Sequence, residues 1–135
     1  MTRPVIHIVA AVVRDARGWL LVVRKRGTSS FMQPGGKIEP GEEPLAALSR
    51  EVREELGVGF DPLTVRALGR HEAAAANEPG HVVDAQLFLV ELDGAPYPDA
   101  EIEEMGWVDP DAPGGIELAP LTEDVVFALA RDLAR

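Results

Sequence analysis

Three glutamates fall within five residues, at positions 51, 54 and 55, behind a Pro-Gly-Gly sequence at 34–36. At about 100° per residue, Glu51, Glu54 and Glu55 would occupy an arc of roughly 100° on one side of a helix. Hard cations prefer oxygen ligands, and Mg²⁺ usually combines a few protein carboxylates with the oxygens of a substrate phosphate. The spacing therefore predicts a divalent-cation site on one face of this helix.

Repulsion among the three carboxylates favours the same interpretation. Packed together, they are expected to have raised pKa values without a metal and to ionise when a cation arrives. Glu55 lies closest to the apolar positions Leu45 and Leu48, so its carboxylate should be the most shielded. A solvated acidic helix face is the alternative for such a charge run. The glycine loop and the neighbouring Arg50 favour the metal site.

The helix that carries the glutamates is predicted to run from about Pro44 to Leu56. Proline suits the first turn of a helix, acidic side chains at 42 and 43 suit its positive end, and Gly57 suits its exit. Apolar residues at helical spacing would form one stripe facing the core. These residues are Leu45, Leu48, Val52 and Leu56.

Short β-rich segments are predicted on both sides of this helix. Thr122 is expected to be the N-cap of a final helix. The order of elements predicts an α/β sandwich of the α+β type, with a mixed β-sheet between helices, as one domain over residues 1–135. The expected strands are Val5–Val13, Trp19–Lys25, Leu63–Arg70, Val82–Leu92 and Ile102–Val108, with an irregular connection at 73–80.

Composition narrows the chemistry. The 135 residues include no cysteine, which excludes disulfides, thiolate metal sites and thiol nucleophiles. A net charge of −10 disfavours binding to a nucleic-acid backbone but allows a small phosphorylated substrate if a metal and a few cations offset the repulsion. The apolar stretch Val5–Val13 is too short to span a membrane, so we expect a cytoplasmic protein without a membrane partner.

Residues 36–58 resemble the signature of the Nudix hydrolases at every defined position. The matching residues are Gly36, Glu42, Arg50, Glu51, Glu54, Glu55, Gly57 and the apolar Val58. This resemblance implies the Nudix fold and, in a MutT-like enzyme, Mg²⁺-dependent attack of water on a diphosphate linkage, with Mn²⁺ as a substitute metal. Dimers are common among such proteins, and nothing in the sequence locates an interface.

The resemblance also implies roles for single residues. Glu51, Glu54 and Glu55 match the family's metal-binding glutamates, and the carbonyl of Gly35 looks like a further ligand. Arg50 matches an arginine that orients a glutamate. Its salt-bridge partner would be Glu42, while Gly57 has a structural role.

The general base is left open between two places. Glu54 is the best candidate within the helix for deprotonating or orienting the attacking water. In some family members the base comes from a later loop, so Glu101, Glu103 or Glu104 would supply it or a further metal ligand. An acidic cluster on an edge strand is the alternative for those three residues.

Basic residues near the second strand are candidates for the substrate phosphates. Strand alternation sends Arg24 and Arg26 to one face and Lys25 to the other. In so acidic a chain, a local group of basic side chains is expected to bind phosphate oxygens. The alternative is that these side chains are simply exposed to solvent at the end of a strand. Lys37 and Gly36 lie inside the signature and would also contact substrate. Phe31 would stack on a base or belong to the core.

Departures from the family's patterns bear on the substrate. Gln33 replaces an apolar residue, and Thr122 stands where sanitisers of oxidised guanine carry asparagine. The alanines at 73–76 lack marker residues of ADP-ribose and diadenosine-polyphosphate hydrolases. The missing markers favour a nucleoside triphosphate pyrophosphohydrolase, whereas Gln33 leaves the local pocket open and Thr122 argues against a specific 8-oxo-dGTP activity. The alternatives are an ADP-ribose or nucleotide-sugar pyrophosphatase and a non-catalytic nucleotide-sensing module, against which the complete set of glutamates argues.

Overall fold

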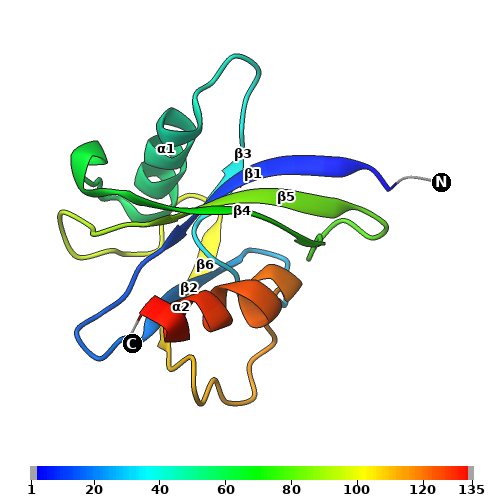
Figure 1. Cartoon of the computed structure of the whole chain (residues 1–135). Coiled ribbons are helices and arrows are strands. Elements are labelled where there is room, and N and C mark those ends of the chain that lie inside the picture. The colour runs from blue at the N-terminus through cyan, green and yellow to red at the C-terminus, as the bar shows by residue number, and fades with distance from the viewer. Residues whose placement is uncertain (1–2, 134–135) are drawn as a thin grey trace.

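The computed structural model describes residues 3–133, which form an α/β/α sandwich with a mixed sheet between two helical layers (Figure 1). Strand β1 (Val5–Val12) pairs in parallel with β5 (Val82–Leu89). Strand β3 (Gly35–Lys37) pairs antiparallel with β1, and β4 (Arg66–Ala74) pairs antiparallel with β5. The resulting order is β3-β1-β5-β4. The predicted fold class is therefore confirmed.

A second sheet joins β2 (Leu20–Lys25) to β6 (Ile102–Val108) in antiparallel register. A tight turn at residues 14–18 separates β1 from β2. Within it, the Asp15 carboxylate accepts hydrogen bonds from the backbone N–H groups of Arg17 and Trp19. This side-chain contact closes the turn and sets the start of β2.

Helix α1 (Pro44–Leu56) covers one face of the four-stranded sheet, with the bounds that the sequence predicts. It ends at Gly57, whose left-handed φ of 69° suits glycine. Leu48, Val52 and Leu56 are fully buried against β1 and β2, as expected. Leu45 is 37% exposed, so its assignment to the buried stripe was wrong. Ala47, fully buried, fills that side of the helix instead.

The C-terminal helical segment covers the opposite side (Figure 1). It comprises a π-helical turn, η2 (Thr122–Val126), and α2 (Phe127–Leu133), which pack with β2 and β5 in a second core layer. Thr122 is not the N-cap, because the helical backbone already begins at Pro120. Thr122 is instead fully buried, and its hydroxyl donates to the Oε1 atom of Gln33 at 2.5 Å.

Two further segments differ from the sequence-based expectation. The Pro-Gly-Gly sequence, expected as a loop, forms most of β3, because its two glycines and the following Lys37 pair with β1. The predicted strand from Leu63 begins later, because Pro62–Thr64 form a 3₁₀ turn that the Asp61 carboxylate caps. The following strand continues to Ala74. Within residues 3–133, no helix is long and apolar enough to cross a membrane.

Candidate functional site

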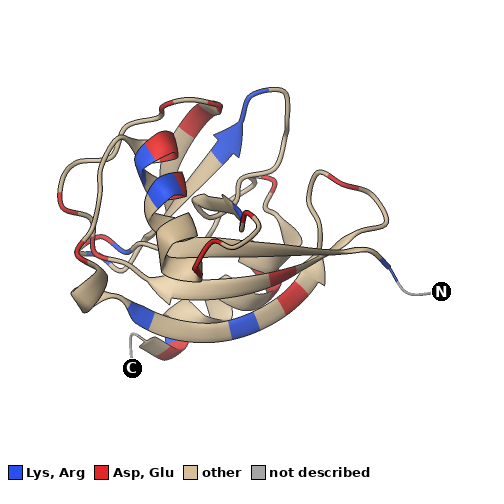
Figure 2. Cartoon of the chain, turned by 90° about the horizontal axis from the view of Figure 1, so that it is seen from above, with Lys and Arg blue, Asp and Glu red and all other residues tan. Residues whose placement is uncertain are grey.

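The three glutamates of α1 lie at different depths. Glu55 is 5% exposed, the side chain of Glu51 is 15% exposed, and that of Glu54 is 55% exposed. Glu55 is therefore the most shielded of the three, as its position beside the apolar stripe predicts. Figure 2 shows the acidic and basic bands of α1 beside the basic band at the end of β3.

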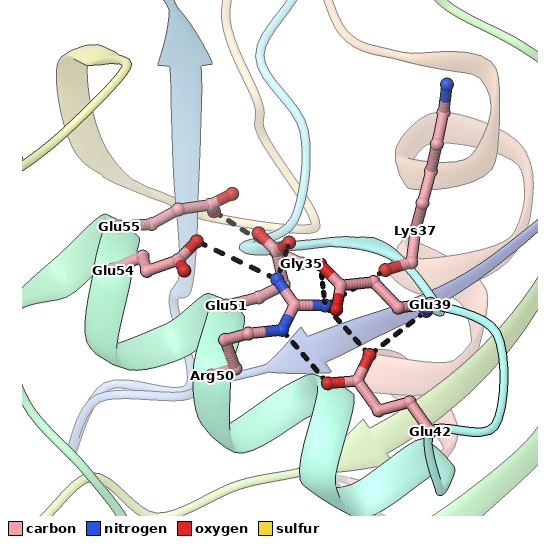
Figure 3. Close-up of polar contacts among 8 residues, drawn as sticks. All are labelled: Gly35, Lys37, Glu39, Glu42, Arg50, Glu51, Glu54 and Glu55. Carbon is pink, nitrogen blue, oxygen red and sulfur yellow. Dashed lines mark hydrogen bonds and ion pairs between the residues drawn. The ribbon is translucent and has the colours of Figure 1, made fainter.

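Two glycines let β3 approach the helix closely. The Gly35 N–H donates to Oε1 of Glu55 at 3.1 Å (Figure 3). A Cβ atom at Gly36 would lie 2.6 Å from the carboxylate carbon of Glu51, and one at Gly35 would lie 2.1 Å from the carbonyl oxygen of Val9. A larger residue at Gly35 would push β3 off β1, and one at Gly36 would displace the Glu51 carboxylate. The Gly-Gly pair is therefore part of the site's geometry.

The pKa of Glu55 is raised to about 8, mainly by burial and in smaller part by the charge and hydrogen bonding of Glu51. The Gly35 N–H and the charge of Lys25 oppose this rise. A buried carboxyl next to a second carboxyl is stable only when a proton or a cation compensates the negative charge. The arrangement of Glu51 and Glu55 therefore fits a divalent metal ion.

Arg50 connects the helix to the loop before it (Figure 3). Its Nε and Nη2 atoms donate to both carboxylate oxygens of Glu42, at 3.0 and 2.9 Å. Its Nη1 atom lies 2.8 Å from Oε1 of Glu51 and 3.8 Å from Oε2 of Glu54. The hydrogen bonds from Arg50 hold the pKa of Glu42 at about 2. The guanidinium therefore fixes the position of Glu51 relative to the loop.

The described residues hold no ready-made group of three His, Cys, Asp or Glu side chains positioned for one metal ion. Glu51 and Glu55 approach each other, whereas Glu54 contacts Arg50. Coordination by all three glutamates would require Glu54 to leave Arg50, which its exposure permits. The Gly35 N–H faces Glu55, and the role of the Gly35 carbonyl as a ligand stays a prediction.

A cavity of about 140 Å³ lies on the other side of the glycine pair. Its apolar walls include Ile6 and Ile8 of β1 and Val83 of β5, and Gly35 and Gly36 form part of its lining. The same two glycines therefore border the helix carboxylates and the cavity. A ligand with an apolar ring and a charged tail could place the ring in the cavity and the tail beside the carboxylates.

Of the cations expected to contact substrate, Lys37 reaches this region, and Arg24 and Arg26 do not. Lys25 lines the cavity and lowers the pKa of Glu55 by its charge. Lys37 also lines the cavity, but its Nζ atom lies 3.4 Å from Glu78 and its side chain points away from the helix carboxylates (Figure 3). Sequence reasoning missed Lys25, although strand alternation placed it opposite Arg24 and Arg26.

Arg24 and Arg26 pair with acidic residues of β6. Nη2 of Arg24 lies 2.7 Å from Glu104, and Nε of Arg26 lies 3.3 Å from Glu103. Arg24 also donates to the carbonyl of Thr28. Neither arginine is among the described residues that line the cavity. Their predicted contacts with substrate would require these ion pairs to break.

Two more predicted residues lie near the site without joining it. Phe31 packs in the core layer of α2 and does not line the cavity. Glu101 follows a segment that is fixed to the end of α1, where the Asp99 N–H donates to the Glu55 carbonyl at 2.9 Å. Ala100, between them, has a left-handed φ of 50°. This contact places the segment that precedes Glu101 against the end of α1.

The chain was compared with known families and proteins. The model of the NUDIX domain matches residues 5–128. The chain is 26% identical to an 8-oxo-dGTP diphosphatase of Haemophilus influenzae, with 98% of this chain and 96% of that protein covered. It is 41% identical over 61 residues to an RNA pyrophosphohydrolase of Halorhodospira halophila, in a match covering 45% of this chain and 33% of that protein.

A solved structure shares the fold. The MutT protein from Methanosarcina mazei superimposes with a TM-score of 0.78 at 23% identity, covering 100% of this chain and 99% of that chain. The likeness therefore extends over the whole fold.

Proposed function

This chain belongs to the Nudix family of hydrolases that act on phosphoric anhydrides, and we propose that it is a nucleoside triphosphate pyrophosphohydrolase. Members of the family generally need a divalent metal ion. In the proposed reaction, water attacks a phosphorus atom of the triphosphate, a bridging P–O bond breaks, and a nucleoside monophosphate and pyrophosphate leave. The nucleoside is a ribo- or deoxyribonucleoside.

One observation supports this proposal most strongly. Gly35 and Gly36 border both the cavity and the carboxylates of α1. A nucleotide with its base in the apolar cavity would therefore extend its phosphates toward Glu51 and Glu55. Lys25 lies between the two places and would offset part of the phosphate charge.

The proposed roles follow from depth and contacts. Glu51, Glu54 and Glu55 would hold Mg²⁺, or Mn²⁺ in its place. The bound ion would neutralise phosphate charge and lower the pKa of water. Glu54 is the most exposed of the three carboxylates, so it is the one best able to take a proton from the attacking water. Arg50 positions Glu51.

The test is a substrate panel with purified protein and Mg²⁺. It contains ribo- and deoxyribonucleoside triphosphates, ADP-ribose, a nucleotide sugar and an RNA with a 5′-triphosphate. We expect pyrophosphate from the triphosphates, no product when the metal is chelated, and little product from the Glu54→Gln variant. A panel without any turnover, under conditions where metal binding is measured, would contradict the proposal.

The panel also separates the alternatives. Faster turnover of ADP-ribose or a nucleotide sugar would favour a pyrophosphatase of such compounds. Faster turnover of the RNA would agree with the name of the Halorhodospira relative, although a net charge of −10 disfavours an extended RNA contact. Tight nucleotide binding in calorimetry without product would favour a sensing module.

A further inference from the structure

The side chain of Gln33 has one buried polar end without a partner. The residue is 5% exposed and lines the cavity. Its Oε1 atom accepts the hydrogen bond from Thr122, which is fully buried. Within residues 3–133, its Nε2 atom is the one buried side-chain nitrogen or oxygen without a hydrogen-bond partner. The amide therefore keeps two unused N–H donors beside the cavity.

The surrounding backbone holds this amide in place. Phe31 exchanges two backbone hydrogen bonds with the segment 117–119, each 2.8 Å long. The hydroxyl of Ser30 donates to the Glu117 carboxylate, and the Met32 N–H donates to the carbonyl of Val23. Gln33 thus follows a loop that is fixed on both sides. Thr122 occupies the oxygen end of the amide, so the nitrogen end is the one left for a ligand.

A buried N–H without an acceptor is costly, and protein interiors rarely tolerate one. The cavity is where an acceptor can enter. Among the nucleobases, guanine and hypoxanthine carry a carbonyl oxygen at C6, and uracil and thymine carry one at C4. Adenine and cytosine carry an amino group at these positions. That amino group is a hydrogen-bond donor, so it cannot accept from the Gln33 amide nitrogen.

We propose that Gln33 is a specificity-determining residue whose Nε2 atom donates to the exocyclic carbonyl oxygen of the substrate's base. The enzyme then selects oxo bases over amino bases. This inference rests on the proposed function in one respect, because it takes the cavity as the place of the base. Thr122 is a positioning residue that presents the amide nitrogen to the cavity.

The first experiment measures binding without hydrolysis. Calorimetry with inosine and adenosine 5′-monophosphates compares two purines that differ at C6, and uridine and cytidine 5′-monophosphates give the matching pyrimidine pair. We expect the oxo member of each pair to bind at least about tenfold more tightly, as is usual when a site's hydrogen bond is lost in the analogue. Equal affinities, preference for the amino member, or no binding of any of the four would overturn the proposal.

Variants of Gln33 and Thr122 then test whether these two residues cause the preference for oxo bases. Gln33→Met keeps the length of the side chain and removes both donors, so the ratio between inosine and adenosine should fall to about one. Thr122→Val removes the hydroxyl and should lower the ratio as well, whereas Thr122→Ser keeps the hydroxyl and should restore it. Ser29→Ala, which removes an exposed hydroxyl bonded to Glu117, is the control and should leave the ratio unchanged.

The affinity ratio separates recognition from folding, because a merely destabilised variant loses affinity for both members of a pair. An unchanged ratio in Gln33→Met would overturn the proposal. So would a nucleotide complex in which a water molecule, and not the base, accepts from Nε2. If the monophosphates are discriminated but no triphosphate is hydrolysed, the proposed function fails and this inference stands. If triphosphates are hydrolysed but the monophosphates are not discriminated, the proposed function stands and this inference fails.

Discussion

Arg50 holds Glu42 through two parallel hydrogen bonds of 3.0 and 2.9 Å, while its third nitrogen donates to Glu51 at 2.8 Å. The planar guanidinium thus links the loop before α1 to a carboxylate of the proposed metal site. The ammonium group of a lysine is a single point charge, so it cannot donate to Glu42 and Glu51 with the planar geometry of a guanidinium. The main role of the Arg50–Glu42 ion pair is therefore to position Glu51, and its charge matters less.

The Arg50→Lys variant tests this role. We expect kcat to fall about tenfold to a hundredfold, because Glu51 loses its fixed orientation. The midpoint of thermal unfolding should change little, because the pair is partly exposed. Arg70→Lys, at an ion pair with Asp84 on β4 and β5, is the matched control and should keep normal kinetics. Normal kcat in Arg50→Lys would refute the positioning role.

The general base is tested by two neutral replacements. Glu54→Gln should keep the fold, because the side chain is 55% exposed, and should lower kcat by about two to four orders of magnitude. Glu101→Gln should stay within a few-fold of the wild type. Near-normal turnover in Glu54→Gln together with a large loss in Glu101→Gln would move the base to the segment that precedes β6.

Glu55 should make the stability of the metal-free protein depend on pH. Its pKa is raised from 4.5 to about 8, so between these values the folded state binds more protons than the unfolded state. This contribution to stability is complete below pH 4.5 and is lost as the pH rises toward 8, at no more than about 1.4 kcal/mol per pH unit.

Urea unfolding with a chelator present, repeated from pH 5 to 8, measures this slope. Glu55→Gln keeps a neutral acceptor for the Gly35 N–H and should flatten the slope relative to the wild type. At pH 8 the variant should be the more stable of the two proteins without metal. Identical slopes in the two proteins would show that Glu55 does not titrate as described.

Divalent metal should stabilise the folded protein, and more so at pH 8 than at pH 6, because the cation competes with the proton on Glu55. At a concentration one hundred times its Kd, a ligand adds about 2.7 kcal/mol to the free energy of unfolding. Glu51→Gln should remove most of this gain, whereas Glu72→Gln on β4 should preserve it. An equal gain at both pH values would contradict the competition.

Lys25 is expected to serve the substrate phosphates in place of Arg24 and Arg26. Lys25→Met should raise KM about tenfold, the usual cost of a lost charged hydrogen bond. Arg26→Met, which removes a cation paired with Glu103 outside the cavity, should change KM less than twofold. The reverse order of effects would restore the assignment made from the sequence.

Local signals predicted much of this molecule. Proline and glycine at its ends, with apolar residues at helical spacing, placed α1 at its observed bounds. The depth of Glu55 followed from its angle to the stripe of Leu45 and Leu48, although Leu45 itself is exposed. These features depend on residues within one element, where periodicity is informative.

Features that depend on contacts between distant segments were not predictable from the sequence. The Pro-Gly-Gly sequence forms β3 only because β1 lies beside it. Thr122 was mistaken for a cap, since its partner Gln33 is 89 residues away. The ion pairs of Arg24 and Arg26 depend on the register between β2 and β6. Such contacts between distant segments are set by tertiary packing, and a local sequence pattern does not predict them.

The most direct test of the proposed metal centre is a crystal structure at about pH 8 with Mn²⁺ and a non-hydrolysable nucleoside triphosphate analogue. The account predicts anomalous signal from Mn²⁺ between Glu51, Glu54 and Glu55, with the analogue's phosphates on the metal and its base in the cavity behind Gly35 and Gly36. Anomalous signal elsewhere, with these carboxylates facing solvent and still bonded only to Arg50 and Gly35, would contradict it.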